Sequence, residues 1–200
     1  MSNLNINTKV ITREQWLNLS SVEISKLFKL EGYEYPTDAK ISCGWALGGQ
    51  KVVGSCNNRI SSEANVNEIF ISPIVQDSLE ALGILTHEMI HAIDDCEHGH
   101  RGIFVKMMKA IGLEGKPTST RIGKELEPKL LAIIEQIGSY PHKKLNRATK
   151  KQGTRMLKMA CSDCDWSFYA SKKMIDRMVT NTCLDCGEDG TLQHIEPKKR

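Results

Sequence analysis

Two histidines and a glutamate between residues 87 and 91 have the spacing of a catalytic metal site. The stretch reads His87-Glu88-Met-Ile-His91. On a helix, residues four apart lie on the same face, so both imidazoles can reach one ion. A catalytic zinc ion takes three protein ligands and keeps a fourth position for water. We therefore expect His87 and His91 to hold zinc, and Glu88 to be the catalytic general base for that water.

The residues before this motif predict the helix that presents it. Asp77 followed by Glu80 is typical of a helix N-terminus. We expect one helix from about Ser78 to about Asp95, with an apolar face made by Leu82, Leu85, Met89 and Ile93. Gly83 costs this helix about 1 kcal/mol relative to alanine. Because it precedes the first histidine by one turn, we expect another element to pack closely against it.

The third metal ligand stays open when only the spacing is considered. The candidates after the second histidine are Asp94, Asp95, Glu97, His98 and His100. A metzincin would have glycine at position 94 and histidine at position 97, so that class is excluded. His98 and His100 both follow the expected helix, and spacing does not separate them. The three acidic residues are also candidates to accept hydrogen bonds from the metal-binding imidazoles.

Four of the seven cysteines form two pairs with the spacing of a zinc ribbon. Cys161-Ser-Asp-Cys164 and Cys183-Leu-Asp-Cys186 are separated by eighteen residues. Four thiolates at this spacing can complete a tetrahedral structural zinc site. Disulfides or a redox pair are the alternative, which a reducing compartment disfavours. The remaining cysteines are expected to be buried free thiols; they are Cys43, Cys56 and Cys96.

Apolar periodicity and turn residues predict the elements around these motifs. In chain order we expect one or two helices after the capping box Thr12-Arg-Glu-Gln15, a β-hairpin from 40–47 and 51–56, a strand over 68–72, the helix of the histidines, a helix over 101–111, a loop over 116–120 and a helix over 123–137. This order predicts an α+β fold: a helical domain with a small antiparallel sheet and a zincin-like active-site helix, followed by a ribbon. The expected boundaries are a catalytic domain over 1–140, a basic linker over 141–155 and a zinc ribbon over 156–200.

The composition is typical of a soluble globular chain. Of the 200 residues, 40% are hydrophobic and 26% are charged. No apolar run approaches the ~18–20 residues that span a membrane. The first residues lack the charged start and apolar core of a secretory signal. We therefore expect a cytoplasmic protein with reduced cysteines and no membrane partner.

Two stretches resemble the SprT-like zinc metallopeptidases. They are Leu85-Thr-His-Glu-Met-Ile-His-Ala92 and Gly99-His100-Arg-Gly-Ile-Phe104, and the resemblance extends over about residues 10–195, including the linker and the cysteine pairs. It implies that His100 is the third ligand of the catalytic zinc and that Phe104 packs against the loop before it. It also implies peptide-bond hydrolysis, with Glu88 as base and one further, structural zinc in the ribbon.

The chain departs from this family in two places. Many members have Gly-Pro-Glu-Phe after the third histidine, whereas this chain has Arg101-Gly-Ile-Phe104. The connection between the second and third histidines is also shorter than in some members. Neither departure removes a ligand, but neither the groove that binds substrate nor the cleavage preference follows from the resemblance.

The C-terminal part of the chain is basic. Residues 141–200 hold 13 Lys and Arg against 7 Asp and Glu, whereas residues 1–140 hold 14 against 17. Six basic residues gather before the ribbon: Lys143, Lys144, Arg147, Lys150, Lys151 and Arg155. Such a stripe is typical of a nucleic-acid surface, although a solvated linker has the same composition. The resemblance favours DNA and protein substrates associated with it, because the family includes a DNA-repair protease.

A second hypothesis needs no catalysis. The chain would be a DNA-binding zinc-ribbon protein whose other metal site is structural, or the two histidines would belong to an ordinary helix. Glu88 separates these readings from the first, because a purely structural metal site has no use for a base. The sequence carries no signal for the oligomeric state.

Overall fold

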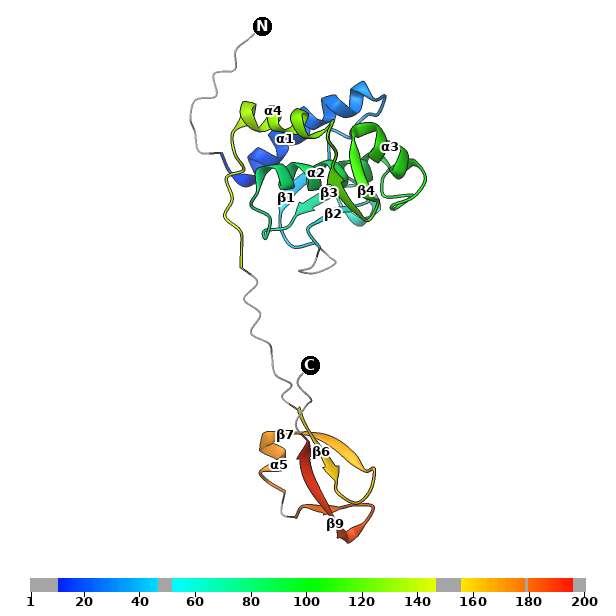
Figure 1. The fold of residues 1–200 in the computed structure, drawn as a ribbon, viewed down its shortest axis with the longest axis vertical. Coiled ribbons are helices and arrows are strands. Elements are labelled where there is room, and N and C mark those ends of the chain that lie inside the picture. Colours follow the sequence, from blue (N-terminus) through cyan, green and yellow to red (C-terminus); the bar gives the residue numbers. More distant parts are fainter. Residues whose placement is uncertain (1–10, 47–51, 147–155, 179, 196–200) are drawn as a thin grey trace. The chain divides into compact units, whose positions relative to one another are not determined.

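A computed structural model describes residues 11–46, 52–146, 156–178 and 180–195 (Figure 1). The chain divides into two compact units, residues 1–147 and 148–200. The fold is α+β, with helices and small separate sheets. Over the described residues, the helices are either too short or too polar to cross a membrane.

One long helix opens the first unit. Helix α1 spans Arg13–Leu30, where the sequence allowed one or two helices. Thr12 caps it as predicted: its hydroxyl accepts from the Gln15 backbone, and the Gln15 side chain accepts from the Thr12 backbone at 2.8 Å. The buried Trp16 indole donates to the Gly138 carbonyl at 2.8 Å. This bond joins the start of α1 to the end of the last helix of the unit.

The sheet of the first unit differs from the expected hairpin. Strands β1 (Lys40–Cys43) and β2 (Gly54–Asn57) both pair with β3 (Glu68–Ile71), in the order β1-β3-β2. β1 runs parallel to β3 and β2 runs antiparallel, so the predictions of a hairpin and of a purely antiparallel sheet are wrong. The physical reason is burial: β3 carries two fully buried isoleucines and takes the central position, and the more polar strands become edges.

Helix α2 (Ser78–Ile93) is the centre of the first unit (Figure 1). Its N-cap is Asp77, whose carboxylate accepts from the Glu80 backbone at 2.8 Å, as the sequence predicts. The helix contacts β2, β3 and three other helices of the unit. Leu82, Leu85 and Met89 are fully buried on it. The residues of the histidine motif therefore stand on the most enclosed element of the unit.

A helix, a hairpin and a second helix complete the unit. Helix α3 (Ile103–Ile111) ends at Gly112, and strands β4 (Leu113–Lys116) and β5 (Ser119–Ile122) follow as an antiparallel pair. The loop predicted over 116–120 is only a turn at residues 117–118, and its flanking residues belong to strands. These strands were missed because their residues are mainly polar and show no apolar alternation. Helix α4 (Glu127–Ile137) begins later than expected and has Pro128 in its first turn, where a missing N–H is harmless.

The second unit is a small sheet with a short helix. The elements are β6 (Met156–Cys161), β7 (Ser167–Ser171), α5 (Lys172–Ile175), β8 (Thr182–Cys183) and β9 (Gly187–Ile195). The strands pair antiparallel in the order β7-β6-β9-β8. Among the described residues its buried core consists of Met159, Cys183 and Leu192. A core this small cannot by itself balance the entropy of folding, so the unit needs a further cross-link.

Candidate metal sites

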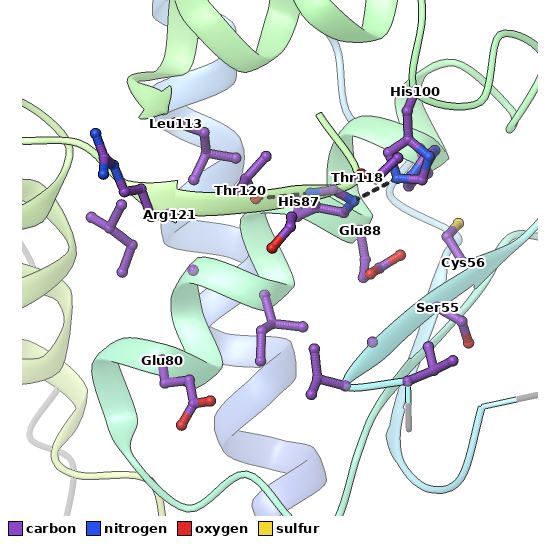
Figure 2. A pocket seen from close by; sticks show the side chains of 18 of the residues that line it. Ser55, Cys56, Glu80, His87, Glu88, His100, Leu113, Thr118, Thr120 and Arg121 are labelled. Atoms are coloured by element: carbon purple, nitrogen blue, oxygen red, sulfur yellow. Dashed lines mark hydrogen bonds between the residues drawn. The ribbon is translucent and has the colours of Figure 1, made fainter. Parts of the chain in front are cut away.

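Three imidazoles converge at helix α2, two from the helix itself and one from the turn after it. Figure 2 shows His87 of the helix facing His100 of the turn. The Nε2 atom of His100 lies 3.1 Å from Nε2 of His87 and 3.2 Å from Nε2 of His91. Tetrahedral zinc with Zn–N bonds of ~2.0–2.1 Å places its nitrogen ligands ~3.4 Å apart. The donor set and its spacing therefore fit a zinc ion with three imidazole ligands.

The turn after α2 brings the third imidazole to the other two. The Cys96 backbone donates to the His91 carbonyl at 2.8 Å, and both Asp95 and Cys96 have positive φ, at 46° and 60°. Such backbone is strained for residues other than glycine. The Asp95 carboxylate offsets this strain by accepting from the Arg59 backbone at 2.9 Å and from the Asn67 amide at 2.8 Å.

Phe104 packs behind the cluster. Its side chain is fully buried, and its ring centre lies 4.5 Å from that of His91 and 5.0 Å from those of His87 and His100. The apolar ring therefore restricts the rotation of all three imidazoles. The resemblance of the motifs to the SprT-like family led us to expect Phe104 to pack against the loop before it, and its ring contacts His100 of that loop.

The structure separates the two histidines that spacing could not distinguish. The His98 side chain is 52% exposed, and its Nδ1 lies 2.8 Å from the Asp94 carboxylate. The imidazole of His98 thus belongs to a pair on the outer side of the turn. Of the described residues, His87, His91 and His100 form the group whose ligand atoms lie close enough to share an ion.

Burial keeps these imidazoles in their neutral form. It lowers the pKa of His87 to about 3 and that of His91 to about 4, and the repulsion that protonated neighbouring imidazoles would exert on one another adds to both shifts. Burial also lowers the pKa of His100. Neutral imidazole is the form that binds metal, so at neutral pH protons do not compete for these nitrogens.

Glu88 is a buried carboxyl beside the imidazoles. It is 6% exposed, and burial raises its pKa to about 8, with the nearby Cys96 thiol as the next cause. The hydrogen bonds of the described residues include none to its carboxyl oxygens, which are not among the fully enclosed polar atoms and so face the cavity that Glu88 lines. A Cβ atom on Gly54 would lie 2.5 Å from Ile84 Cγ2 and 2.7 Å from Glu88 Oε1, so any other residue at this point of β2 would force these α2 side chains to shift.

The imidazoles and Glu88 line one cavity (Figure 2). Its volume is about 730 Å³, and its walls come from β2, from α2, from the turn after α2 and from β5. Two half-buried thiols, Cys56 and Cys96, also line it, and the Cys96 thiol lies 3.5 Å from the Cys56 carbonyl. Like Cys43, they are only half-buried, whereas the sequence analysis expected fully buried thiols.

The carboxylates expected to orient the imidazoles lie elsewhere. Asp94 bonds to His98, Asp95 supports the turn, and Glu97 is exposed. Among the described residues, Thr120 instead bonds to an imidazole of the cluster on the nitrogen that faces away from the ion position: its Oγ1 lies 2.9 Å from His87 Nδ1. No fixed sequence spacing connects a threonine of β5 to a histidine 33 residues earlier, so sequence reasoning missed it.

The four cysteines of the two pairs meet in the second unit. The Sγ atoms of Cys161 and Cys186 lie 3.9 Å apart, those of Cys164 and Cys183 lie 3.7 Å apart, and all four lie within 4.8 Å of one another. Zn–S bonds of ~2.3 Å in a tetrahedron place the sulfurs ~3.8 Å apart. The four thiols therefore fit a closed zinc site, and its four Zn–S bonds would cross-link the small core of the unit.

The basic stripe is only partly described. Lys143 and Lys144 are exposed and follow α4 in an extended segment, which the Leu145 backbone ties to the Pro73 carbonyl at 2.8 Å. The first part of the expected linker thus lies against the first unit. The other predicted contacts, Arg147, Lys150, Lys151 and Arg155, lie outside the described residues.

Comparison of the chain with protein-family models, with curated proteins and with solved structures finds no match in any of the three. The structure shows two clusters of possible metal ligands, one of three histidines and one of four cysteines, and each could hold a metal ion. The two clusters differ in chemistry. Three imidazoles leave a vacant position on a tetrahedral ion, whereas four thiolates fill it.

Proposed function

We propose that the chain is a zinc metallopeptidase of the SprT-like kind that acts on proteins associated with DNA. One observation carries the proposal: a buried, unpartnered carboxyl and three convergent imidazoles line the same cavity. Metal ligands with a base beside them, in a cavity that can admit substrate, are the parts that metal-assisted hydrolysis requires. The zincin-like placement of His87 and His91 on one helix supports the same class.

The proposal assigns the metal ligands and Phe104 separate roles. His87, His91 and His100 would hold the catalytic zinc, and the four cysteines would hold the structural one. Zinc at the first site would polarise the scissile carbonyl and lower the pKa of a coordinated water from ~15.7 toward ~7. Phe104 keeps the three rings in place and excludes water from their inner side.

Glu88 is the proposed general base. Its carboxyl holds a proton near pH 7 in the metal-free chain, because burial disfavours the charged form. A cation close by favours the carboxylate, so metal binding would ready Glu88 to accept a proton. It would take that proton from the attacking water and deliver it to the leaving amine.

Glu88→Gln tests the assignment. Cleavage of protein substrates, assayed with and without single- or double-stranded DNA, should fall by at least ~10²-fold, because the base is lost. Zinc content should stay at that of the wild type, because Glu88 is not a ligand. Glu80→Gln is the matched control: Glu80 is exposed on the same helix and lines the same cavity. Retained cleavage in Glu88→Gln would remove this residue from the mechanism.

The alternative function is a DNA-binding ribbon protein with a structural histidine site. The exposed Lys143 and Lys144 and the basic C-terminal part favour DNA as a partner in either case. Glu88 favours catalysis, since a structural site gains nothing from a buried carboxyl that costs desolvation. Metal analysis of His100→Ala, in which two zinc ions per chain should fall to one, shows whether the histidine site binds at all.

DNA binding has a test of its own. Neutralising Lys143, Lys144, Lys150 and Lys151 together should weaken binding, because each phosphate contact releases counterions. For duplex DNA the slope of log K against log salt should become shallower by up to ~3–4. The measurement is a salt titration of binding by the full chain, and an unchanged slope would assign these lysines to solvent.

A further inference from the structure

The hydrogen bond between β5 and the first histidine bears on how the metal site is built. Thr120 Oγ1 lies 2.9 Å from His87 Nδ1, and the opposite nitrogen of the same ring, Nε2, faces His100 (Figure 2). One ring atom therefore points to the hydroxyl, while the other points to the place where an ion would sit. The bond joins two elements that are far apart in the sequence.

A neutral imidazole carries one proton, and its position decides which nitrogen can bind metal. When Nδ1–H of His87 donates to the Thr120 hydroxyl, the lone pair is left on Nε2. When the proton is on Nε2, that nitrogen cannot be a ligand. The Thr120 hydroxyl can accept from Nδ1–H or donate to an unprotonated Nδ1; the first arrangement gives the tautomer that the metal needs, and both fix the plane of the ring.

The strand that carries Thr120 is held firmly against α2. A Cβ atom on Gly83 would lie 2.8 Å from Ile122 Cγ1, so β5 packs on the helix one turn before His87. A Cβ atom on Gly123 would lie 2.5 Å from the Gly112 carbonyl, so the residue after β5 also packs tightly against the residue before β4. The packing of β5 against α2, together with the hydrogen bond, therefore sets the position of the Thr120 hydroxyl.

No rival for this role is found among the described residues. The carboxylates of Asp94 and Asp95 are bonded to other partners, and Glu97 is exposed. The outer nitrogens of His91 and His100 have no hydrogen bond to a side chain in the part of the chain that is described. The site thus has one identified support, and it acts on the first ligand.

We propose that Thr120 is the positioning residue of the metal site, which holds His87 as an Nε2 ligand through the bond from Nδ1–H to its hydroxyl. The proposal rests on the proposed function only in taking the three imidazoles as a zinc site. It does not require that the bound zinc cleaves peptide bonds.

The test compares Thr120→Val with Thr120→Ser in the full chain. Valine has the shape of threonine without the hydroxyl, whereas serine keeps the hydroxyl. Zinc affinity of the histidine site, measured by chelator competition with the cysteine site loaded, should fall about 10–100-fold in Thr120→Val. Thr120→Ser should restore it to within a few-fold of wild type. Ser119→Ala, which removes the neighbouring hydroxyl of β5, should leave it unchanged.

A second readout needs neither zinc at the histidine site nor activity. In the chain with only its cysteine site loaded, ¹⁵N spectra of the imidazoles should show His87 protonated on Nδ1 in the wild type and in Thr120→Ser. In Thr120→Val the proton should move toward Nε2, where the lone pairs of the neighbouring rings can accept it. An unchanged tautomer, or equal zinc affinity in valine and serine variants, would overturn the proposal. Absence of peptidase activity in all variants, the wild type included, would refute the proposed function and leave this result standing.

Discussion

At the scale of single residues, burial sets the charge of every group in the histidine site. The pKa values of His87 and His91 fall to about 3 and about 4, while that of Glu88 rises to about 8. All of these shifts favour the neutral form, as desolvation requires. The three imidazoles and Glu88 are therefore mainly neutral near pH 7 in the metal-free chain, and a divalent cation would bind without displacing protons from the imidazoles.

The pH dependence of zinc binding follows from these values. Three ordinary histidines with pKa values near ~6.5 would lose affinity steeply between pH 6.5 and 5.5, since each must release a proton. Here His87 and His91 are already neutral, so the groups that can still release a proton when the ion binds are Glu88 and the charged fraction of His100, whose pKa burial lowers. We expect log Kd of the histidine site to change by at most about two units per pH unit over this range.

Chelator competition at several pH values, with the cysteine site loaded, measures this slope. Glu88→Gln is the control, because it removes the proton that Glu88 contributes and should flatten the dependence further. A slope near three protons in the wild type would contradict the shifts of the imidazoles.

At the scale of elements, the geometry of the site depends on how two short polar strands pack against α2. Gly83 costs helix stability, yet its missing side chain lets Ile122 of β5 approach the helix. The same strand places Thr120 against His87. The close packing expected at this glycine from the sequence is present, and it supports the ligand one turn further along the helix.

Gly83→Ala tests this link between helix and strand. Alanine should gain about 1 kcal/mol of helix propensity. The clash at 2.8 Å with Ile122 should cost about 1–3 kcal/mol, because the strand must move away. We therefore expect a net loss in the free energy of unfolding and a weaker zinc site, measured by denaturant titration and chelator competition.

The double variant Gly83→Ala with Ile122→Ala provides the control. Removing the isoleucine side chain relieves the clash, so the two changes should be less harmful together than the sum of the single effects. Strictly additive effects would show that the packing of β5 on this glycine is not what positions the strand.

At the scale of the whole molecule, the two units differ in what holds them together. The first has a large apolar core built from α1, α2, α3, α4 and the sheet, with more than twenty buried apolar side chains among the described residues. Among the described residues the second has four buried side chains, Met159, Ala170, Cys183 and Leu192, of which Cys183 is itself one of the four thiols. Its stability must therefore come mainly from the metal that the thiols could hold.

Cys161→Ser should unfold the second unit and leave the first intact. A structural zinc contributes ~10–16 kcal/mol to small domains of this kind, so loss of one ligand removes most of their stability. Limited proteolysis of the full chain should then remove residues beyond about 148 while the first unit resists. Cys43→Ser is the matched control, because Cys43 lies on β1 and is not part of the cluster. A protease-resistant second unit in Cys161→Ser would show that its fold does not depend on four thiolates.

The sequence by itself determined what depends on local spacing. The helix of His87 and His91, its Asp77 cap, the capping box of α1 and the two cysteine pairs all follow from short-range geometry, because a helix or a tight turn fixes the distance between near neighbours. The prediction that the chain is a metallopeptidase stays a prediction, which the experiments above address.

Only the tertiary structure decided which distant residues complete the site. It placed β3 between β1 and β2, formed the β4–β5 hairpin, brought Thr120 to His87 and set His100, which spacing left open and the family resemblance implied, beside the first two imidazoles. None of these contacts is set by local spacing, because each depends on which surfaces are buried against one another once the whole unit has packed. Chain neighbours therefore place the first two imidazoles, and packing across the unit places the third and its support.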